Sequence, residues 1–119
     1  MSLVAIVGRD LIVSTRIANA AGAAGHDVIR VDDPSGLPDS RSVAVAFVDW
    51  AERDAGWSKL LAAWRQQASE GLNTPQKVVL FGPHTDLEAH ADARAAGLGP
   101  MLARSKLIVD LPRLLGSLA

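Results

Sequence analysis

The sequence predicts a single α/β domain built on a doubly wound, five-stranded parallel sheet. Three observations lead to this class: short runs rich in valine, isoleucine and phenylalanine, helical segments between most of them, and a length of 119 residues. Runs that are apolar at nearly every position are typical of strands covered by helices on both faces. A chain of this length fits one domain, so residues 1–119 are treated as one unit.

Five strands are expected from these runs. The first, third and fourth are apolar throughout, the second carries Arg30, and the fifth is the shortest. Each run is followed by polar or turn residues, which marks where a strand ends. The expected strands cover residues 3–7, 28–31, 43–48, 78–81 and 100–103.

Helices are expected after the first and third strands. Asp10 can cap a helix over residues 11–24, and Gly25 supplies its stop signal. The second helix is expected over residues 56–69, where apolar side chains recur at helical spacing: Trp57, Leu60, Leu61, Trp64 and Ala68. For Trp57 and Trp64, packing against the sheet is favoured over an aromatic binding platform.

Two more helices are expected after the fourth and fifth strands. Thr85 opens a Thr-Asp-Leu-Glu sequence that matches a capping box, and this helix should end near Gly97. The last helix is expected to follow Ser105 or Asp110. Pro112 favours the first turn of a helix capped by Asp110, because proline lacks the N–H that a helix interior needs.

The connection between the second and third strands lacks a helix in this interpretation. Residues 32–42 contain Pro34, Gly36 and Pro38, which makes the segment too short and too rich in turn residues for a full helix. We expect a loop or a single helical turn there. The expected order of elements is therefore β-α-β-β-α-β-α-β-α.

Composition argues against several classes of function. The formal net charge of −1 gives no basic footprint for nucleic acid, and no apolar run is long enough to cross a bilayer. The chain has no cysteine, which excludes a disulfide, a thiolate zinc site and a thiol nucleophile. We therefore expect a cytoplasmic protein that binds neither nucleic acid nor membrane.

Residues that follow the strands are the candidates for a functional site. In an open parallel α/β sheet, ligands bind at the carboxyl ends of the strands. Asp49 is the most informative candidate, because it directly follows an apolar run where an unpaired charge would be expensive. The residues selected in this way are Gly8, Arg9, Asp10, Asp49, Trp50, Gly82, Pro83, His84, Arg104 and Ser105.

Over nearly its whole length the chain resembles the receiver domain of two-component response regulators. Residues 45–49 (VAFVD) resemble the third strand of that family and its phospho-accepting aspartate, here Asp49. Residues 93–97 (ARAAG) resemble the small-residue and glycine signature before the fifth strand, and residues 101–104 (MLAR) resemble that strand. The resemblance implies a flavodoxin-like sheet and a role in signal transduction.

The family's acid pair is missing. Receivers carry two adjacent acids after the first strand that help to bind magnesium, whereas this chain has Gly8 and Arg9, with Asp10 one place further on. Magnesium prefers carboxylate and water oxygens, and phosphoryl transfer uses the metal to offset charge. With only Asp10 and Asp49 available, any magnesium site should be weak, so no cofactor is expected.

Two other family positions also differ. Gly82 stands where receivers have a hydroxyl residue, so no side chain is present to bond a phosphoryl oxygen. Arg104 stands at the lysine position, which keeps the charge but replaces a compact ammonium by a planar fork. Ser105 replaces the proline that follows. Arg9 offers a substitute for the missing metal, because its guanidinium could form a fixed ion pair with Asp49.

These changes favour a pseudo-receiver, a regulatory module without enzymatic activity that acts through protein contacts. In receivers, the surface of the fourth helix, fifth strand and fifth helix mediates such contacts, which corresponds here to residues 85–119. We expect a separate protein partner or self-association through that face. A phosphorelay receiver phosphorylated on Asp49 remains an alternative. A small-molecule binder that uses the strand-end crevice is a second alternative.

His84 is a further candidate, in the loop after the fourth strand. It could be a pH-sensitive group or a ligand contact, although a loop histidine satisfied by local hydrogen bonding is favoured. His26 and His90 are expected at the surface, and the three histidines lack metal-ligand spacing. The sequence also lacks a glycine-rich phosphate loop and a nucleophile elbow.

Overall fold

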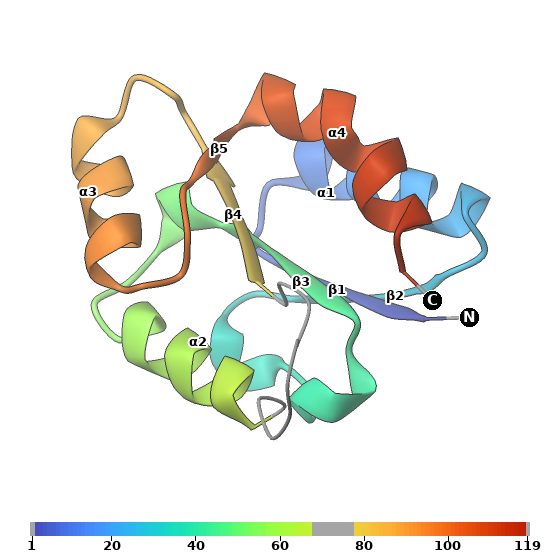
Figure 1. Ribbon diagram of the computed structural model, residues 1–119, viewed down its shortest axis with the longest axis horizontal. Helices are drawn as coiled ribbons and strands as arrows, with labels where there is room; N and C mark the ends of the chain where they lie inside the picture. Colours follow the sequence, from blue (N-terminus) through green and yellow to red (C-terminus); the bar gives the residue numbers. More distant parts are fainter. Residues whose placement is uncertain (1, 68–77, 119) are drawn as a thin grey trace.

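A computed structural model describes residues 2–67 and 78–118 of the chain. Its centre is a parallel sheet with the strand order β2-β1-β3-β4-β5 (Figure 1). The reversal of strand order at β1 makes the sheet doubly wound, so the predicted fold class is confirmed. The strands are β1 (Leu3–Val7), β2 (Asp27–Val31), β3 (Val45–Asp49), β4 (Val78–Gly82) and β5 (Leu102–Ala103).

Helices cover both faces of this sheet (Figure 1). One apolar cluster joins one sheet face to the first and last helices, and a second cluster joins the other face to the two middle helices. The three central strands are almost completely buried, which explains why their sequences are apolar at every position. The helices are α1 (Leu11–Ala23), α2 (Trp57–Gln66), α3 (Leu87–Ala95) and α4 (Arg104–Gly116).

The strand register brings the loops that carry the candidate site to one edge. Val7 pairs with Val48, so β1 and β3 end side by side, and Asp49 pairs with Phe81 of β4. The last pairing, between Gly82 and Ala103, places the start of α4 beside the end of β4. The carboxyl ends of four strands therefore meet where Asp49 lies.

The first two helices follow their sequence signals. Asp10 caps α1 by accepting from the backbone N–H of Ile12 at 2.9 Å, and Gly25 adopts φ +84° just past its end. Both tryptophans of α2 are buried, and the indole N–H of Trp64 donates to the carbonyl of Pro38 at 2.7 Å. The expectation that they pack inside is confirmed. The expected last turn of this helix, over residues 68–69, lies outside the described residues.

The cap of α3 differs from the prediction. Asp86, not Thr85, is the N-cap residue, and its carboxylate accepts from the backbone N–H of Ala89 at 3.0 Å. The backbone N–H of Asp86 donates to the carbonyl of Pro83, which forms a turn that includes Thr85 and delays the helix by one residue. Asp86 then has the extended backbone that an N-cap requires.

The predicted start of the last helix was wrong. The helix α4 begins at Arg104, with Ala103 at the N-cap position, and Pro112 lies in its interior. Three leucines at intervals of four residues are buried against the sheet: Leu107, Leu111 and Leu115. Burial of three leucines stabilises by about 1.5–3 kcal/mol each, which outweighs the roughly 3 kcal/mol that an interior proline costs. Packing therefore overrides the local signal at Pro112.

The segment between β2 and β3 forms two short 3-10 turns, η1 (Pro34–Gly36) and η2 (Ser40–Ser42). Asp33 and Asp39 cap them through hydrogen bonds to Ser35 and Arg41. This confirms the prediction of a crossover without a full helix. Among the described residues, no helix is long and apolar enough to span a membrane.

Candidate functional site

Asp49 is the last residue of β3 and lies at the centre of the candidate site. Its side chain is only 3% exposed, and its Oδ1 accepts from the backbone N–H of Ala51 at 3.2 Å. A buried carboxylate needs partners, because an unpaired charge in an apolar setting is costly. The groups that surround Asp49 therefore decide what this position can do.

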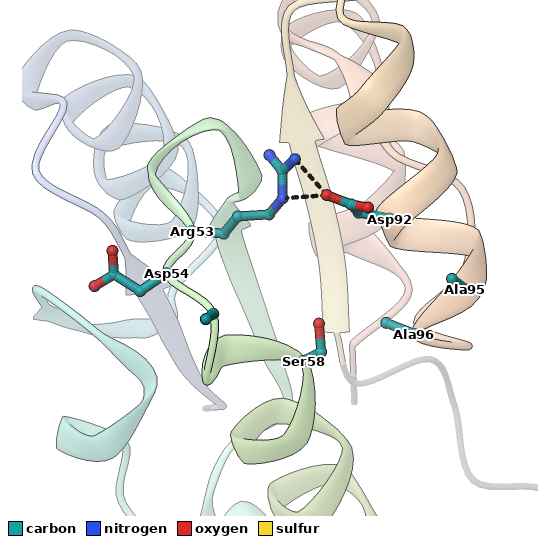
Figure 2. A pocket seen from close by; sticks show the side chains of 7 residues that line it. Arg53, Asp54, Ser58, Asp92, Ala95 and Ala96 are labelled. Atoms are coloured by element: carbon teal, nitrogen blue, oxygen red, sulfur yellow. Dashed lines mark hydrogen bonds and ion pairs between the residues drawn. The ribbon is translucent and has the colours of Figure 1, made fainter.

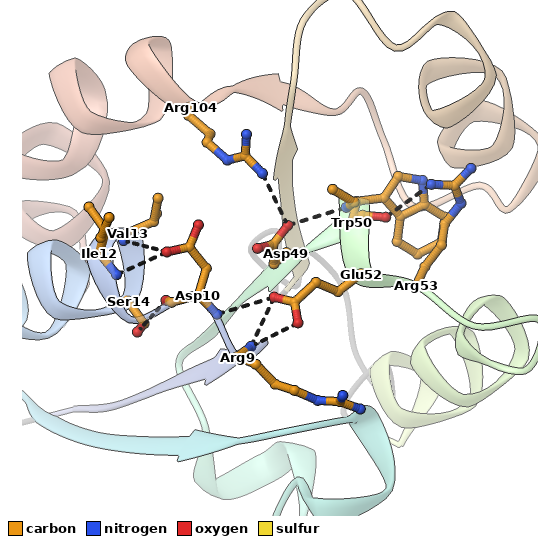
Figure 3. A network of polar contacts seen from close by, with 11 residues as sticks. Arg9, Asp10, Ile12, Val13, Ser14, Asp49, Trp50, Glu52, Arg53 and Arg104 are labelled. Atoms are coloured by element: carbon orange, nitrogen blue, oxygen red, sulfur yellow. Dashed lines mark hydrogen bonds and ion pairs between the residues drawn. The ribbon is translucent and has the colours of Figure 1, made fainter.

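The cation beside Asp49 is Arg104. Its Nη2 lies 3.9 Å from Oδ1 of Asp49, and the first turn of α4 holds it there (Figure 3). The buried Nε–H of Arg104 finds no acceptor among the described residues. The structure thus brings together the two residues that the family resemblance singled out, at the long limit of an ion pair.

Arg9 does not form the predicted ion pair with Asp49. It reaches the site through its backbone N–H, while its exposed side chain points away from Asp49 (Figure 3). The pKa of the Asp33 carboxyl is lowered mainly by hydrogen bonds from Ser35, with a smaller contribution from the charge of Arg9. The charge of Arg9 therefore stabilises the ionised form of Asp33. Arg104, and not Arg9, is the cation beside Asp49.

Glu52 is the site residue that the sequence did not reveal. It ends a 3-10 turn, η3 (Trp50–Glu52), that directly follows Asp49. Its carboxylate accepts from the backbone N–H of Arg9 at 2.9 and 3.1 Å and from that of Asp10 at 3.2 Å (Figure 3). The only signal in the sequence was an acid three residues after Asp49. The sequence does not show that the turn η3 brings this acid back to the loop after β1.

The carboxyls of Asp49 and Glu52 interact with each other. Burial, followed by a hydrogen bond and charge repulsion involving Glu52, raises the pKa of Asp49 to about 6. Arg104 and the N–H of Ala51 act in the opposite direction but do not compensate. Asp49 is therefore a carboxyl that takes up a proton far more readily than an exposed aspartate.

Gly8 is required by this arrangement. It has φ +144°, and a Cβ atom added there would lie 2.8 Å from the Cβ of Asp49 and 3.1 Å from Oε2 of Glu52. No side chain fits at this distance without displacement of the main chain. The first position of the family's acid pair is therefore closed to any acid in this backbone conformation.

Gly82 is closely packed as well, against a flexible side chain. A Cβ atom added at this residue would lie 2.8 Å from Sδ of Met101, which is buried over the end of β4. The thioether of Met101 thus occupies the space next to Gly82 where receivers carry a hydroxyl. Two departures from the family pattern, at Gly8 and Gly82, are matched by close packing.

Asp10 forms hydrogen bonds within the first turn of α1. Its carboxylate caps α1, and its carbonyl accepts from the hydroxyl of Ser14 at 2.7 Å. In residues 2–67 and 78–118, no three histidine, cysteine, aspartate or glutamate side chains are grouped so as to hold a metal ion. The weak magnesium binding expected at Asp10 and Asp49 stays a prediction.

The other predicted neighbours lie at the rim. His84 is exposed, and its carbonyl, not its ring, lies 3.0 Å from Nε2 of His90. Ser105 is exposed in the first turn of α4. The structure gives neither side chain a contact with Asp49 among the described residues, so their roles stay predictions.

A second network links the turn after Asp49 to α3. The buried indole of Trp50 donates to the carbonyl of Ala89 at 3.0 Å. The guanidinium of Arg53 lies 5.5 Å from the centroid of the Trp50 ring and donates to Oδ2 of Asp92 at 2.6 and 3.1 Å. Asp49 is thus followed by a segment held to α3 by one indole and one ion pair.

A cleft of about 560 Å³ opens beside this network, between the start of α2 and the second half of α3 (Figure 2). The Arg53–Asp92 ion pair lies in its wall, and small side chains leave the space open. Because Arg53 is already matched by Asp92, the cleft presents no unpaired cation to a ligand. Its lining residues are Arg53, Asp54, Ala55, Ser58, Asp92, Ala95 and Ala96.

Comparisons with known proteins agree with the geometry. No protein-family model and no curated protein matches the chain. Among solved structures, the receiver domain of Francisella response regulator 1452 is 18% identical with a TM-score of 0.63, covering 97% of this chain and 93% of that one. A Clostridium thermocellum receiver domain is 13% identical with a TM-score of 0.63, covering 97% and 94%.

A pilus assembly-related protein of Burkholderia pseudomallei is also similar. It is 18% identical, with a TM-score of 0.61, and the match covers all of this chain and 92% of that one. At these identities the likeness concerns the fold. The chain has the receiver-domain fold of response regulators, as its strand pattern and the motif that ends in Asp49 had indicated.

Proposed function

We propose that the chain is a receiver-like regulatory module that acts through protein–protein contacts, without magnesium-dependent phosphorylation of Asp49. One observation carries this proposal: groups of the chain itself fill the surroundings of Asp49. The carboxylate of Glu52 binds the loop after β1, Gly8 packs against Asp49, and Met101 covers Gly82. A phosphoryl group and a metal ion would both need that space.

The charges around Asp49 also oppose phosphorylation. The transferred phosphoryl group is negatively charged, and phosphoryl transfer relies on metal ions and cations to neutralise it. Here Glu52 adds a second carboxyl beside Asp49, while Arg104 supplies one cation at 3.9 Å. A nucleophilic carboxylate with a raised pKa is also protonated more often, which lowers its reactivity further. The module is therefore expected to have no enzymatic activity.

Residues 85–119 form the face that we propose for protein contacts, by analogy with receivers. Its described part contains two large apolar side chains that are mostly exposed, Leu87 at 77% and Val109 at 75%. Exposed apolar side chains of this size lose unfavourable hydration when a partner covers them. A separate protein or a second copy of the chain, in the cytoplasm, is the partner that this proposal requires.

The test is an attempt to phosphorylate the wild-type protein. It is incubated with magnesium and acetyl phosphate, or with beryllofluoride, and its intact mass and Trp50 fluorescence are followed. Because Trp50 directly follows Asp49, a bound phosphoryl analogue should change its emission. We expect no adduct and no fluorescence change. A stable adduct that disappears in Asp49→Asn would overturn the proposal.

A phosphorelay receiver is the second candidate, and the position of Arg104 favours it. This residue lies beside Asp49 as the family's lysine would, and its Nε–H has no acceptor in the described part of the chain. A positive result in the same experiment would establish this function. The small-molecule alternative would gain support if a native mass spectrum showed a retained ligand.

A further inference from the structure

The cleft between α2 and α3 has a lining that contains none of the groups in contact with Asp49. It measures about 560 Å³, and sites for small ligands measure about 300–1,000 Å³. One wall is the start of α2 with the loop before it, and the other is the second half of α3 (Figure 2). The cleft is thus large enough for a small molecule or for a side chain of another protein.

Part of the wall is fixed by the ion pair between Arg53 and Asp92. The guanidinium of Arg53 donates to Oδ2 of Asp92 through Nε and Nη2, at 3.1 and 2.6 Å, and to the carbonyl of Trp50 through Nη1, at 3.0 Å. The Arg53 side chain is only 18% exposed and lies over the Trp50 ring. All three of its nitrogens are therefore engaged, and they hold Asp92 in place with one oxygen left over.

Hydrogen-bond acceptors remain open in the same cleft. Within residues 2–67 and 78–118, Oδ1 of Asp92 accepts no hydrogen bond, and neither the hydroxyl of Ser58 nor the carboxylate of Asp54 makes one. Ser58 and Asp92 belong to opposite walls, whereas the Asp54 carboxylate is turned away from Asp92 (Figure 2). A ligand between the walls therefore meets a carboxylate oxygen on one side and a hydroxyl on the other.

The charge of the lining favours a cation. The carboxylates of Asp54 and Asp92 and the guanidinium of Arg53 are its charged groups, so negative charge is in excess. The one cation is matched by Asp92 at 2.6 Å. An anionic ligand would add to the excess of negative charge, whereas a cation would complement it.

The position of the acceptors favours a guanidinium over an ammonium. A guanidinium carries five N–H donors in a rigid planar fork and is more weakly hydrated than an ammonium. It can therefore donate to Oδ1 of Asp92 and to Oγ of Ser58 at the same time. The rest of the lining includes the methyl groups of Ala55, Ala95 and Ala96, which offer an apolar surface to an alkyl chain.

We propose that this cleft binds an alkylguanidinium group, with the guanidinium between Asp92 and Ser58 and the alkyl chain on the alanines. The group belongs either to a free small molecule or to an arginine side chain of another protein, since both present the same chemistry. The inference goes beyond the proposed function, because it assigns a ligand to a site that does not involve Asp49.

The test is a titration of the wild-type protein with matched ligands, followed by the NMR chemical shifts of the backbone amides of Ser58, Ala95 and Ala96. Butylguanidinium carries the expected group, and butylurea has the same alkyl chain and a similar planar head without the charge. The peptide acetyl-Gly-Arg-Gly-amide presents the group as an arginine side chain. The same peptide with citrulline in place of arginine is its uncharged control.

We expect butylguanidinium to bind with a dissociation constant on the order of 1 mM, as its small size implies. Butylurea should bind at least about tenfold more weakly, because it lacks the charged hydrogen bonds. Tighter binding of the arginine peptide than of butylguanidinium would identify a protein as the source of the group, and the reverse would identify a free small molecule. Equal effects of charged and uncharged ligands would overturn the proposal.

The variant Ala95→Leu tests the position of the site, because leucine at this exposed residue of the lining fills the cleft. Ala91→Leu adds the same side chain at an exposed residue of α3 outside the lining, so it is the matched control. Butylguanidinium should bind Ala95→Leu at least about tenfold more weakly than the wild type, since its charged hydrogen bonds are lost, and should bind Ala91→Leu unchanged. Equal affinities for the two variants would contradict the site.

These outcomes do not depend on one another or on the proposed function. The comparison of butylguanidinium with butylurea uses the wild type alone, so it decides the chemistry of the ligand even if Ala95→Leu does not fold. Phosphorylation of Asp49 would overturn the pseudo-receiver proposal and leave the cleft unaffected. Conversely, a lack of guanidinium binding would remove only the ligand of the cleft.

Discussion

Substitution of Asp49 by asparagine tests the electrostatics of the site directly. The pKa of Asp49 rises from 3.8 to about 6 on folding, so the folded state binds more protons than the unfolded state between these values. Stability must therefore fall as pH increases from about 4 to about 6, and it stays lower above that range. Asparagine carries no charge at any of these pH values, so Asp49→Asn removes this dependence.

The size of the effect follows from the same shift. At about 1.4 kcal/mol per pH unit, the buried charge costs about 3 kcal/mol above pH 6. The attraction of Arg104 is already included in this net shift of the Asp49 pKa, so its loss is not subtracted again. The hydrogen bond from Ala51 survives, because asparagine keeps an acceptor oxygen. We therefore expect Asp49→Asn to be about 3 kcal/mol more stable than the wild type at pH 7.5.

Urea unfolding at pH 4.0 and pH 7.5, followed by tryptophan fluorescence, measures both quantities. All other ionisable groups are the same in both proteins, so the difference between the two pH profiles isolates Asp49. The wild type should lose stability relative to the variant as pH rises. Parallel profiles, or a variant that is less stable at pH 7.5, would refute the view that Asp49 is a strained, buried carboxyl.

Three further substitutions, two beside Asp49 and one in α2, test individual contacts by urea unfolding. Gly8→Ala should destabilise by about 1–3 kcal/mol more than Gly25→Ala, since both have positive φ but only Gly8 has Asp49 at 2.8 Å; equal losses would contradict the close approach. Gly82→Thr should lose about 1–2 kcal/mol through Met101, and Met101→Ala in the same chain should restore part of it; strict additivity would count against this contact. Trp64→Phe should lose about 1 kcal/mol with its 2.7 Å hydrogen bond, and an unchanged stability would show that the bond contributes nothing.

Much of the fold could be predicted because its signals are local. The uninterrupted apolar runs predicted buried parallel strands, and the cap at Asp10 and the stop at Gly25 depend only on neighbouring residues. Pro112 shows the limit of such signals. Three buried leucines of α4 hold the helix together, and their contribution depends on the sheet that they cover.

The site could be predicted only in part, for a related reason. Asp49 and Arg104 were identified because they follow strands whose ends must meet. Glu52 was missed because it acts through backbone N–H groups, and the sequence does not show where a backbone donor points. The same fact explains Arg9, which was expected to act through its side chain and instead contributes its main chain.

The network of Trp50, Arg53 and Asp92 has a thermodynamic consequence. It ties the turn after Asp49 to α3, which belongs to the face proposed for partner binding. If protonation of Asp49 changes the position of this turn, it changes the free energy of binding at α3. Linkage is reciprocal, so a partner on α3 must then shift the proton affinity of Asp49 by the same free energy. Proton uptake by the buried Asp49 during complex formation would then report the binding of a partner at the surface of α3.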